Sequence, residues 1–301
     1  MWFKNLIVYR IPANWECDLT EMDDLLSRHA LQRCGSFEME SRGWVAPCSD
    51  GRFVHSVHRQ LLVALGVERK LLPASVVNQF TKERAAEVAE QQGYPVGRKQ
   101  LREIKENVIE QLLPKAFALR RTTRAWVDPV NGWLVIDAGA KGKAEEFTEM
   151  FRRSIEDAPF WRLDTQRSPA AAMTEWVASG DGPAGFSIDQ DLDLCSVGEG
   201  KATVRYVRHG LEGKEIQDHV AAGKTATRLG MTWSDRISFV LDEALQIRRL
   251  SFLDVLKDGA EGQGENADEQ FDIEFVLMAG ELSRLLADLV AALGGEKERP
   301  T

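Results

Sequence analysis

Residues 98–124 carry eight basic side chains against three acidic ones, and their spacing suits contact with phosphate groups. On a predicted helix over residues 98–113, Arg98, Arg102 and Lys105 fall at separations of four and three. They should form one stripe, opposite the face that carries Leu101, Val108 and Leu112. The full basic set is Arg98, Lys99, Arg102, Lys105, Lys115, Arg120, Arg121 and Arg124. Such side chains can follow a DNA backbone without reading its bases, although a solvated charged face gives the same spacing.

Phe117 lies between the two halves of this basic set. An aromatic side chain in such a place can wedge against nucleic acid, whereas a core position at a helix end is its commoner role. The separations of Arg120, Arg121 and Arg124 suit a helix, because a strand would alternate them. The segment therefore predicts a DNA-binding surface with an aromatic residue inside it.

The net charge of −9 is compatible with this prediction. Residues 254–301 alone carry twelve acidic and four basic side chains, a net charge of −8. Charges are screened over about 8 Å at physiological salt, so acidic and basic segments act as separate surfaces. A protein-interaction scaffold that binds through this acidic tail is a further hypothesis.

Two other groups resemble sites without matching them. Residues 138–144 lie between a predicted strand and a predicted helix, as a phosphate-binding loop does, but Asp137 and Ala144 stand where that loop needs Gly and Ser or Thr. His55 and His58 would lie on opposite faces of a strand with no carboxylate partner close by. We therefore predict neither a phosphate loop nor a metal site.

Asp189, Asp191 and Asp193 alternate along the chain and should share one face of a strand. Magnesium-dependent nucleases use clustered carboxylates, so a carboxylate-dependent nucleic-acid enzyme is the alternative function. A solvated strand face is the commoner cause of such a pattern. Because no GxSxG, HExxH, CxxC or GxGxxG motif occurs, we expect a protein that is not an enzyme and needs no cofactor.

The four cysteines are irregularly spaced, so we expect reduced, buried side chains in a cytoplasmic protein. The chain opens without the features of a signal peptide. It has no apolar run near the about 20 residues that span a bilayer, and no membrane partner is expected.

The hydrophobic pattern predicts an α+β fold with antiparallel sheets, an inserted helical hairpin and a C-terminal amphipathic helix. The expected strands cover residues 2–11, 43–46, 52–57, 60–68, 121–128, 132–138, 190–195, 202–208, 224–232, 236–242, 246–252 and 271–278. The expected helices cover residues 18–31, 74–92, 98–113, 143–156, 169–178, 213–222 and 280–293.

These elements suggest three regions. Residues 1–73 with 115–180 form a central α+β region, and residues 74–114 form a helical finger. Residues 181–301 form a second α+β region with an acidic loop at 258–267 and the C-terminal helix.

Motifs along the whole chain, from residue 1 to about residue 295, resemble the bacterial recombination-associated RdgC family. They are Met1-Trp2-Phe3-Lys4-Asn5-Leu6-Ile7-Val8-Tyr9-Arg10, Cys34-Gly35, Gly43-Trp44-Val45, Leu112-Leu113-Pro114-Lys115-Ala116-Phe117, Thr174-Glu175-Trp176-Val177, Ala222-Gly223-Lys224 and Phe275-Val276-Leu277-Met278-Ala279-Gly280-Glu281-Leu282.

The resemblance implies a curved subunit with a projecting finger, and a ring-shaped homodimer around double-stranded DNA that has no sequence preference. Single-stranded DNA is a second candidate ligand. The resemblance also implies a nucleoid-associated protein that restrains the RecA recombinase by competing for DNA or obstructing it.

The same resemblance implies roles for individual residues. Phe117 falls at the family's interface gate, and Arg208 and His209 match positions near that gate where relatives carry polar or basic residues. The chain departs from the family pattern at His209, which stands in place of an amide, and at residues 93–97, which replace a more charged helical stretch.

Overall fold

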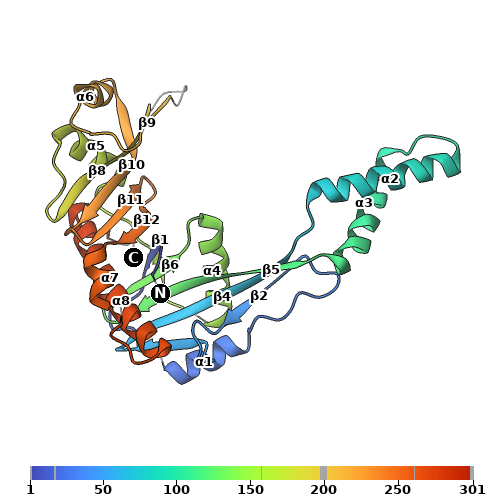
Figure 1. Cartoon of the computed structure of the whole chain (residues 1–301), viewed down its shortest axis with the longest axis horizontal. Helices are drawn as coiled ribbons and strands as arrows, with labels where there is room; N and C mark the ends of the chain where they lie inside the picture. Colours follow the sequence, from blue (N-terminus) through green and yellow to red (C-terminus); the bar gives the residue numbers. More distant parts are fainter. Residues whose placement is uncertain (1, 17, 157, 197–201, 261, 299–301) are drawn as a thin grey trace. The chain divides into compact units, whose positions relative to one another are not determined.

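The computed structural model describes residues 2–16, 18–156, 158–196, 202–260 and 262–298. Eight α-helices and twelve strands in the described ranges form the α+β architecture that the sequence predicts. Figure 1 shows these elements along the chain. The strands are β1 (Leu6–Arg10), β2 (Glu40–Val45), β3 (Val54–Val57), β4 (Gln60–Lys70), β5 (Ala118–Asp128), β6 (Trp133–Asp137), β7 (Trp161–Arg162), β8 (Phe186–Ser196), β9 (Thr203–Tyr206), β10 (Lys224–Trp233), β11 (Ile237–Asp242) and β12 (Gln246–Phe252).

The helices are α1 (Leu19–Ser27), α2 (Ala74–Gln92), α3 (Arg98–Leu112), α4 (Lys141–Ser154), α5 (Pro169–Ser179), α6 (Lys214–Ala221), α7 (Asp254–Ala260) and α8 (Ala267–Ala292). A short 3₁₀ helix, η1 (Leu113–Lys115), follows α3. Among the described residues, no helix is both long and apolar enough to cross a membrane.

The strands form one sheet in the order β2-β4-β5-β6-β1-β12-β11-β10-β8-β9, while β3 pairs with β4 and β7 pairs with β1. The described pairings between these strands are antiparallel. The chain divides into two compact units. The first contains residues 1–25, 46–63 and 123–301, and the second contains residues 26–45 and 64–122. The three-region division expected from the sequence stays a prediction.

The β5–β6 hairpin of the first unit joins two strands that the sequence predicts. Asp128 Oδ1 accepts hydrogen bonds from the backbone N–H groups of Val130 and Asn131 at 3.0 and 3.1 Å. Gly132 has a φ of 76°, and a Cβ at this position would lie 2.6 Å from the carbonyl oxygen of Ile11. The turn therefore needs glycine for its backbone conformation and for the close approach of β1.

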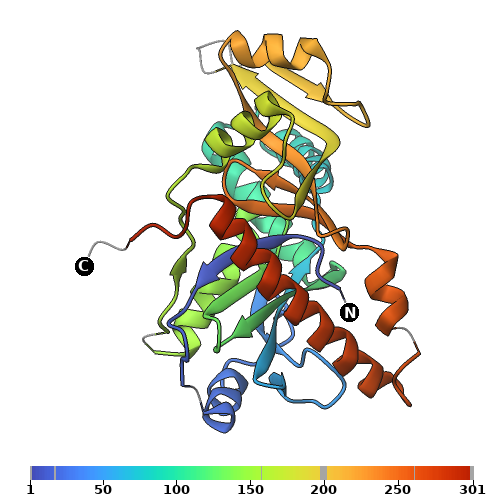
Figure 2. The ribbon, with the colours of Figure 1, turned by 90° about the vertical axis from the view of Figure 1, so that its left-hand side faces the viewer.

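Helix α8 supplies much of the core of the first unit. Figure 2 shows it lying across the face of the sheet that contains β1. Its buried residues Phe275, Met278, Leu282 and Leu285 belong to one hydrophobic cluster with residues of the sheet.

The predicted strand over residues 271–278 is wrong, because these residues belong to α8. Burial along α8 recurs at Phe275, Met278 and Leu282, and these separations of three and four residues are typical of a helix. The acidic loop expected at 258–267 is also partly wrong, since α7 extends to Ala260. An Asn266 side chain that accepts from the N–H groups of Asp268 and Glu269 begins α8 instead.

In the second unit, α2 and α3 form the predicted helical hairpin (Figure 1). Buried Val77, Ile104 and Val108 hold the two helices together. Gly93, with a φ of 79°, ends α2. Pro73 occupies the N-cap position of α2 and makes no side-chain capping bond.

Gly43 lies where β2 meets the segment after α1. Residues 29–31 run along the outer side of β2. The Trp44 N–H donates to His29 O, and the Leu31 N–H donates to Trp44 O, both at 2.9 Å. A Cβ on Gly43 would lie 2.4 Å from backbone atoms of Leu31, so only glycine fits here.

Candidate nucleic-acid interface

The basic residues of α3 are exposed. Arg98, Lys99, Arg102 and Lys105 all face solvent, while Ile104 and Val108 are buried. The basic stripe is not opposite the buried face, because about 100° around the helix axis separates the two. The expected apolar position Leu101 is itself 43% exposed. The stripe therefore borders the packed face of the hairpin.

Ion pairs leave most of the four basic side chains of α3 available. Within the described residues, Arg102 is the member of the four with an ion pair, to Glu106 one turn on at 3.0 Å. Both partners are mostly exposed, and such pairs contribute little to stability. A phosphate group can therefore replace Glu106 as the partner of Arg102.

The three arginines after Phe117 lie on a strand, so the expectation of helical spacing is wrong. Along β5, Arg120 and Arg124 are exposed and Arg121 is half-buried, as strand alternation requires. Later in the strand, Thr123, Ala125, Trp126 and Val127 are buried and hold β5 in the sheet. Arg120 belongs to the second compact unit and Arg124 to the first.

Arg120 is engaged by a carboxylate. Its Nη2 lies 2.9 Å from Glu68 Oε2, and Glu68 Oε1 accepts the backbone N–H of Cys34 at 2.9 Å. The Cys34 N–H and the Arg120 guanidinium hold the pKa of Glu68 below its usual value. Arg120 is therefore a weaker candidate for phosphate contact than the residues of α3.

Lys115 and Phe117 lie just after α3, where the finger hairpin ends. Lys115 ends η1 and is exposed. The Phe117 side chain is 84% exposed, although its carbonyl oxygen is fixed by the N–H of Leu71 at 2.7 Å. Leu71 and Leu119 are exposed as well. Phe117 thus belongs to an exposed apolar group and not to the core.

Arg208 and His209 follow β9 in the first unit, and both are exposed. The Arg208 N–H donates to Asp191 Oδ1 at 3.1 Å. His209 Nδ1 lies 2.8 Å from Gly210 O, and its ring centroid lies 5.3 Å from that of Tyr206. The backbone of this loop is therefore held in place while the Arg208 side chain is presented to solvent.

Sequence reasoning missed a second basic group, which we call the arginine hollow. Arg205, Arg228, Arg248 and Arg249 line a cavity of about 100 Å³ over β8–β12. These four arginines lie on β9, β10 and β12 and are spread over 44 positions of the sequence. They therefore do not appear as a basic run in the sequence. The register of β8 is the signal that joins them, because Asp193 faces both Arg205 and Arg228 across the strand pairs.

Two aspartates of β8 form ion pairs with these arginines. Asp193 binds Arg205 through two contacts of 2.8 and 2.9 Å, and Asp191 pairs with Arg249 at 3.0 Å. Asp189 accepts from the Thr232 hydroxyl, and burial raises the pKa of Asp189. In the described ranges these three carboxylates do not gather as a metal-ligand group.

The histidines differ from expectation. His58 lies in the turn after β3 with a φ of 50°. His55 has two carboxylate partners, Asp50 at 3.3 Å and Asp272 at 2.8 Å, so the expectation of no nearby carboxylate is wrong. Asp272 comes from α8, which lies far along the chain and is close only in the folded protein.

The cysteines are less buried than expected. Cys34, Cys48 and Cys195 are free thiols at half-buried positions, because they lie in connecting segments or near a strand end and not in the core. Cys17 lies outside the described residues.

Comparison with known proteins shows the family of this chain. Residues 1–296 match the family model described as "Putative exonuclease, RdgC". Recombination-associated protein RdgC of Janthinobacterium sp. (strain Marseille) is 52% identical over 299 residues, which cover 99% of this chain and 100% of the relative. The protein of the same name from Dechloromonas aromatica (strain RCB) is 55% identical over 98% of both chains. These relatives form a class of recombination-associated proteins. The chain belongs to the RdgC family.

Proposed function

We propose that this chain is a non-enzymatic protein that binds double-stranded DNA without sequence preference. The exposed basic residues of α3, Arg98, Lys99, Arg102 and Lys105, carry the proposal, because three of these four cations have no ion-pair partner within the described residues. Cations held in a row on a helix suit contact with successive phosphates. The family's recombination-associated relatives favour DNA as the polyanion.

The arginine hollow supports the same function. Arg205, Arg228, Arg248 and Arg249 meet the carboxylates of Asp191, Asp193 and Asp242. A guanidinium has five N–H donors, so an arginine that is paired with a carboxylate still has donors for a phosphate. The nearby Arg208 adds a further exposed cation.

The proposed assembly is a ring-shaped homodimer around the duplex. Its support is the apolar group of Leu71, Phe117 and Leu119, whose exposure suits a protein contact better than water. Phe117 then acts as an interface gate and not as a wedge between bases. A closed ring on DNA obstructs the RecA recombinase by occupying its substrate, and nonspecific DNA binding places the protein at the nucleoid in the cytoplasm. Single-stranded DNA is a weaker second ligand.

The alternative is a magnesium-dependent nucleic-acid enzyme, which the word exonuclease in the family description raises. Its candidate carboxylates are Asp189, Asp191 and Asp193. Two of them form ion pairs with arginines, so they suit a structural role better than metal binding. Incubation of DNA with the protein and Mg²⁺ separates the two functions. Cleavage that is lost in Asp191→Ala would support the enzyme, whereas shifted but intact DNA supports the binding protein.

Retention on circular and linear DNA tests the ring. After binding at low salt, a challenge at high salt removes contacts that depend on charge alone. A closed ring stays on covalently closed circles and slides off free ends. Equal loss from both forms would rule out encirclement while leaving DNA binding intact.

A further inference from the structure

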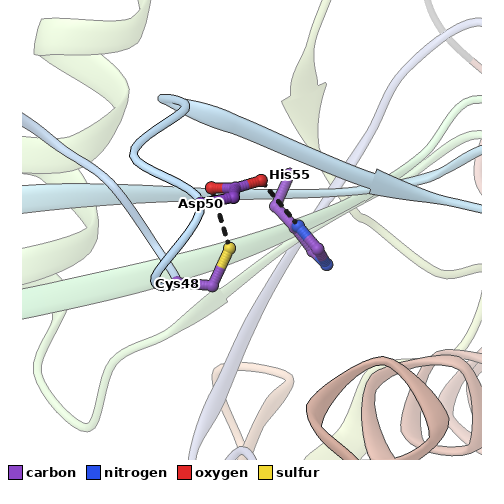
Figure 3. A group of neighbouring side chains, drawn as sticks. All are labelled: Cys48, Asp50 and His55. Atoms are coloured by element: carbon purple, nitrogen blue, oxygen red, sulfur yellow. Dashed lines mark hydrogen bonds and ion pairs between the residues drawn. The ribbon is translucent and has the colours of Figure 1, made fainter. Parts of the chain in front are cut away.

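Three side chains with different metal-binding chemistry meet in the first compact unit. Cys48 and Asp50 lie in the loop between β2 and β3, and His55 lies on β3 (Figure 3). Cys48 Sγ lies 3.2 Å from Asp50 Oδ1, and His55 Nδ1 lies 3.3 Å from Asp50 Oδ2. One ligand atom of each residue lies within 4.8 Å of the others.

The fold holds these groups in place. Asp50 Oδ1 also accepts the N–H of Arg52 at 3.0 Å, which shapes the loop. His55 is only 12% exposed, because its ring packs against Phe271 and Phe275 of α8 at centroid distances of 5.6 and 6.1 Å. The imidazole therefore cannot turn freely away from Asp50.

Asp272 fixes the proton on His55. Its Oδ1 lies 2.8 Å from Nε2, and an ionised carboxylate only accepts hydrogen bonds, so Nε2 carries a hydrogen. The lone pair of a neutral ring then lies on Nδ1, which faces the second carboxylate, Asp50. Two acceptors that face each other need a proton or a cation between them. A carboxylate that binds the far nitrogen of a histidine is the arrangement by which metal sites orient that ligand.

The distances fit a metal of small radius. Tetrahedral zinc bonds to sulfur, nitrogen and oxygen place neighbouring ligand atoms about 3.5 Å apart. Cys48 Sγ lies 3.2 Å from Asp50 Oδ1 and His55 Nδ1 lies 3.3 Å from Asp50 Oδ2, so the thiol and the imidazole each lie near this value from one oxygen of the carboxylate. A thiolate and an imidazole select zinc and similar ions over magnesium and calcium, which prefer oxygen ligands.

We propose that Cys48, Asp50 and His55 bind a divalent transition-metal ion, with Zn²⁺ as the preferred ion. Water completes the fourth position, and Asp272 orients His55 as an outer partner. The Cys48 thiol releases its proton to solvent when the ion binds. Because Asp272 belongs to α8 and Ser49 bonds to Asp268 of the same helix, the ion fastens the β2–β3 loop against α8. The site is independent of DNA binding.

Cobalt titration of the full-length protein, freed of metal with a chelator, tests this site. We expect one Co²⁺ per chain, with a sulfur-to-cobalt charge-transfer band and the visible bands of tetrahedral cobalt, both displaced by Zn²⁺. Cys48→Ser should remove the charge-transfer band. Asp272→Asn should keep that band but weaken affinity about 10- to 100-fold, as loss of an outer partner does.

Two variants serve as matched controls. Cys34→Ser removes another half-buried thiol, and His58→Ala removes the histidine of the adjoining turn; neither should change cobalt binding. Absence of stoichiometric binding, or a charge-transfer band that survives Cys48→Ser, would overturn the proposal.

Thermal unfolding gives a second measurement. Zn²⁺ at about 100 times its Kd should raise the Tm of the wild-type protein by about 5 °C. The same addition should not change the Tm of Asp50→Asn, which keeps the shape of the side chain but removes its charge. An equal rise in that variant would show that zinc binds elsewhere.

Discussion

Glu68 and Arg120 form an ion pair of 2.9 Å between neighbouring segments of the second compact unit. The same carboxylate accepts the backbone N–H of Cys34, so it fixes the segment after α1 as well as β5. Arg120 therefore has a structural role in this unit that does not depend on DNA.

This pair predicts a pH-dependent stability. The Cys34 N–H and Arg120 lower the pKa of Glu68 in the folded state, so the stabilisation is present above the unfolded pKa of about 4.3 and is lost as the pH falls through the folded value. Arg120→Ala should lower the urea midpoint at neutral pH, and the difference from wild type should shrink at acid pH as Glu68 becomes protonated. Arg102→Ala, which breaks an exposed helix pair, is the control and should change little. An equal deficit of Arg120→Ala at both pH values would contradict the role of the ion pair.

The α3 stripe predicts how DNA binding depends on salt. Binding should weaken by about 10³-fold or more between about 50 and about 200 mM salt if six or more phosphates are contacted. Arg98→Ala and Lys99→Ala should each reduce the slope of log affinity against log salt by about 1, equally for unrelated sequences. Fluorescence anisotropy with two duplexes measures both quantities. Lys297→Ala in the acidic tail is the control. A flat salt response would remove the electrostatic basis of the proposal.

Two substitutions in the arginine hollow should have opposite effects on DNA affinity. Arg249 is 75% exposed and pairs with Asp191. Arg249→Ala should weaken DNA binding and reduce the salt slope by about 1. Asp191→Asn should strengthen binding, because it removes a competing negative charge and keeps an oxygen that can accept from the Arg208 N–H. If both variants bound DNA like the wild type, this surface would not contact DNA.

Phe117 predicts a separation of assembly from DNA affinity. Phe117→Ala should weaken the dimer and the inhibition of RecA more than it weakens binding to a short duplex. Sedimentation and anisotropy measure these effects separately. Leu101→Ala removes another exposed apolar side chain of the same unit and serves as control. A loss of DNA affinity with an intact dimer would instead indicate a wedge against the bases.

The core position of Phe275 predicts a large loss of stability. The residue is fully buried on α8 within the main hydrophobic cluster. Phe275→Ala should lower the free energy of unfolding by about 3–5 kcal/mol. Val255→Ala at an exposed position of α7 should change it by about 0.5 kcal/mol or less. Denaturant unfolding of both variants is the measurement, and similar midpoints would contradict the packing of α8.

Local signals predicted much of the fold. Helix α2 has the bounds expected from its apolar spacing and from Gly93, and the turn at Gly132 follows from its residue types. The pattern failed at residues 271–278, because a short apolar run has no clear period and fits a strand or a helix. Burial against the sheet, which depends on distant residues, decides for the helix.

The candidate sites show the same limit. The basic stripe of α3 is contiguous, so the sequence reveals it. The arginine hollow depends on strand register, and the partnership of His55 with Asp272 joins residues 217 positions apart. Neither can be found from spacing along the chain, because pairing and helix packing create the proximity.

The close contact at Gly43 also limits pairing of the edge of the sheet with other molecules. β2 is the terminal strand of the sheet order, and an uncovered terminal strand offers free N–H and C=O groups to another molecule. Residues 29–31 occupy part of that edge through their bonds to Trp44, and they can do so only because residue 43 has no side chain. A larger residue at position 43 would lift this cover and open the edge to intermolecular β-pairing. The absence of one methyl group thus serves the solubility of the folded chain.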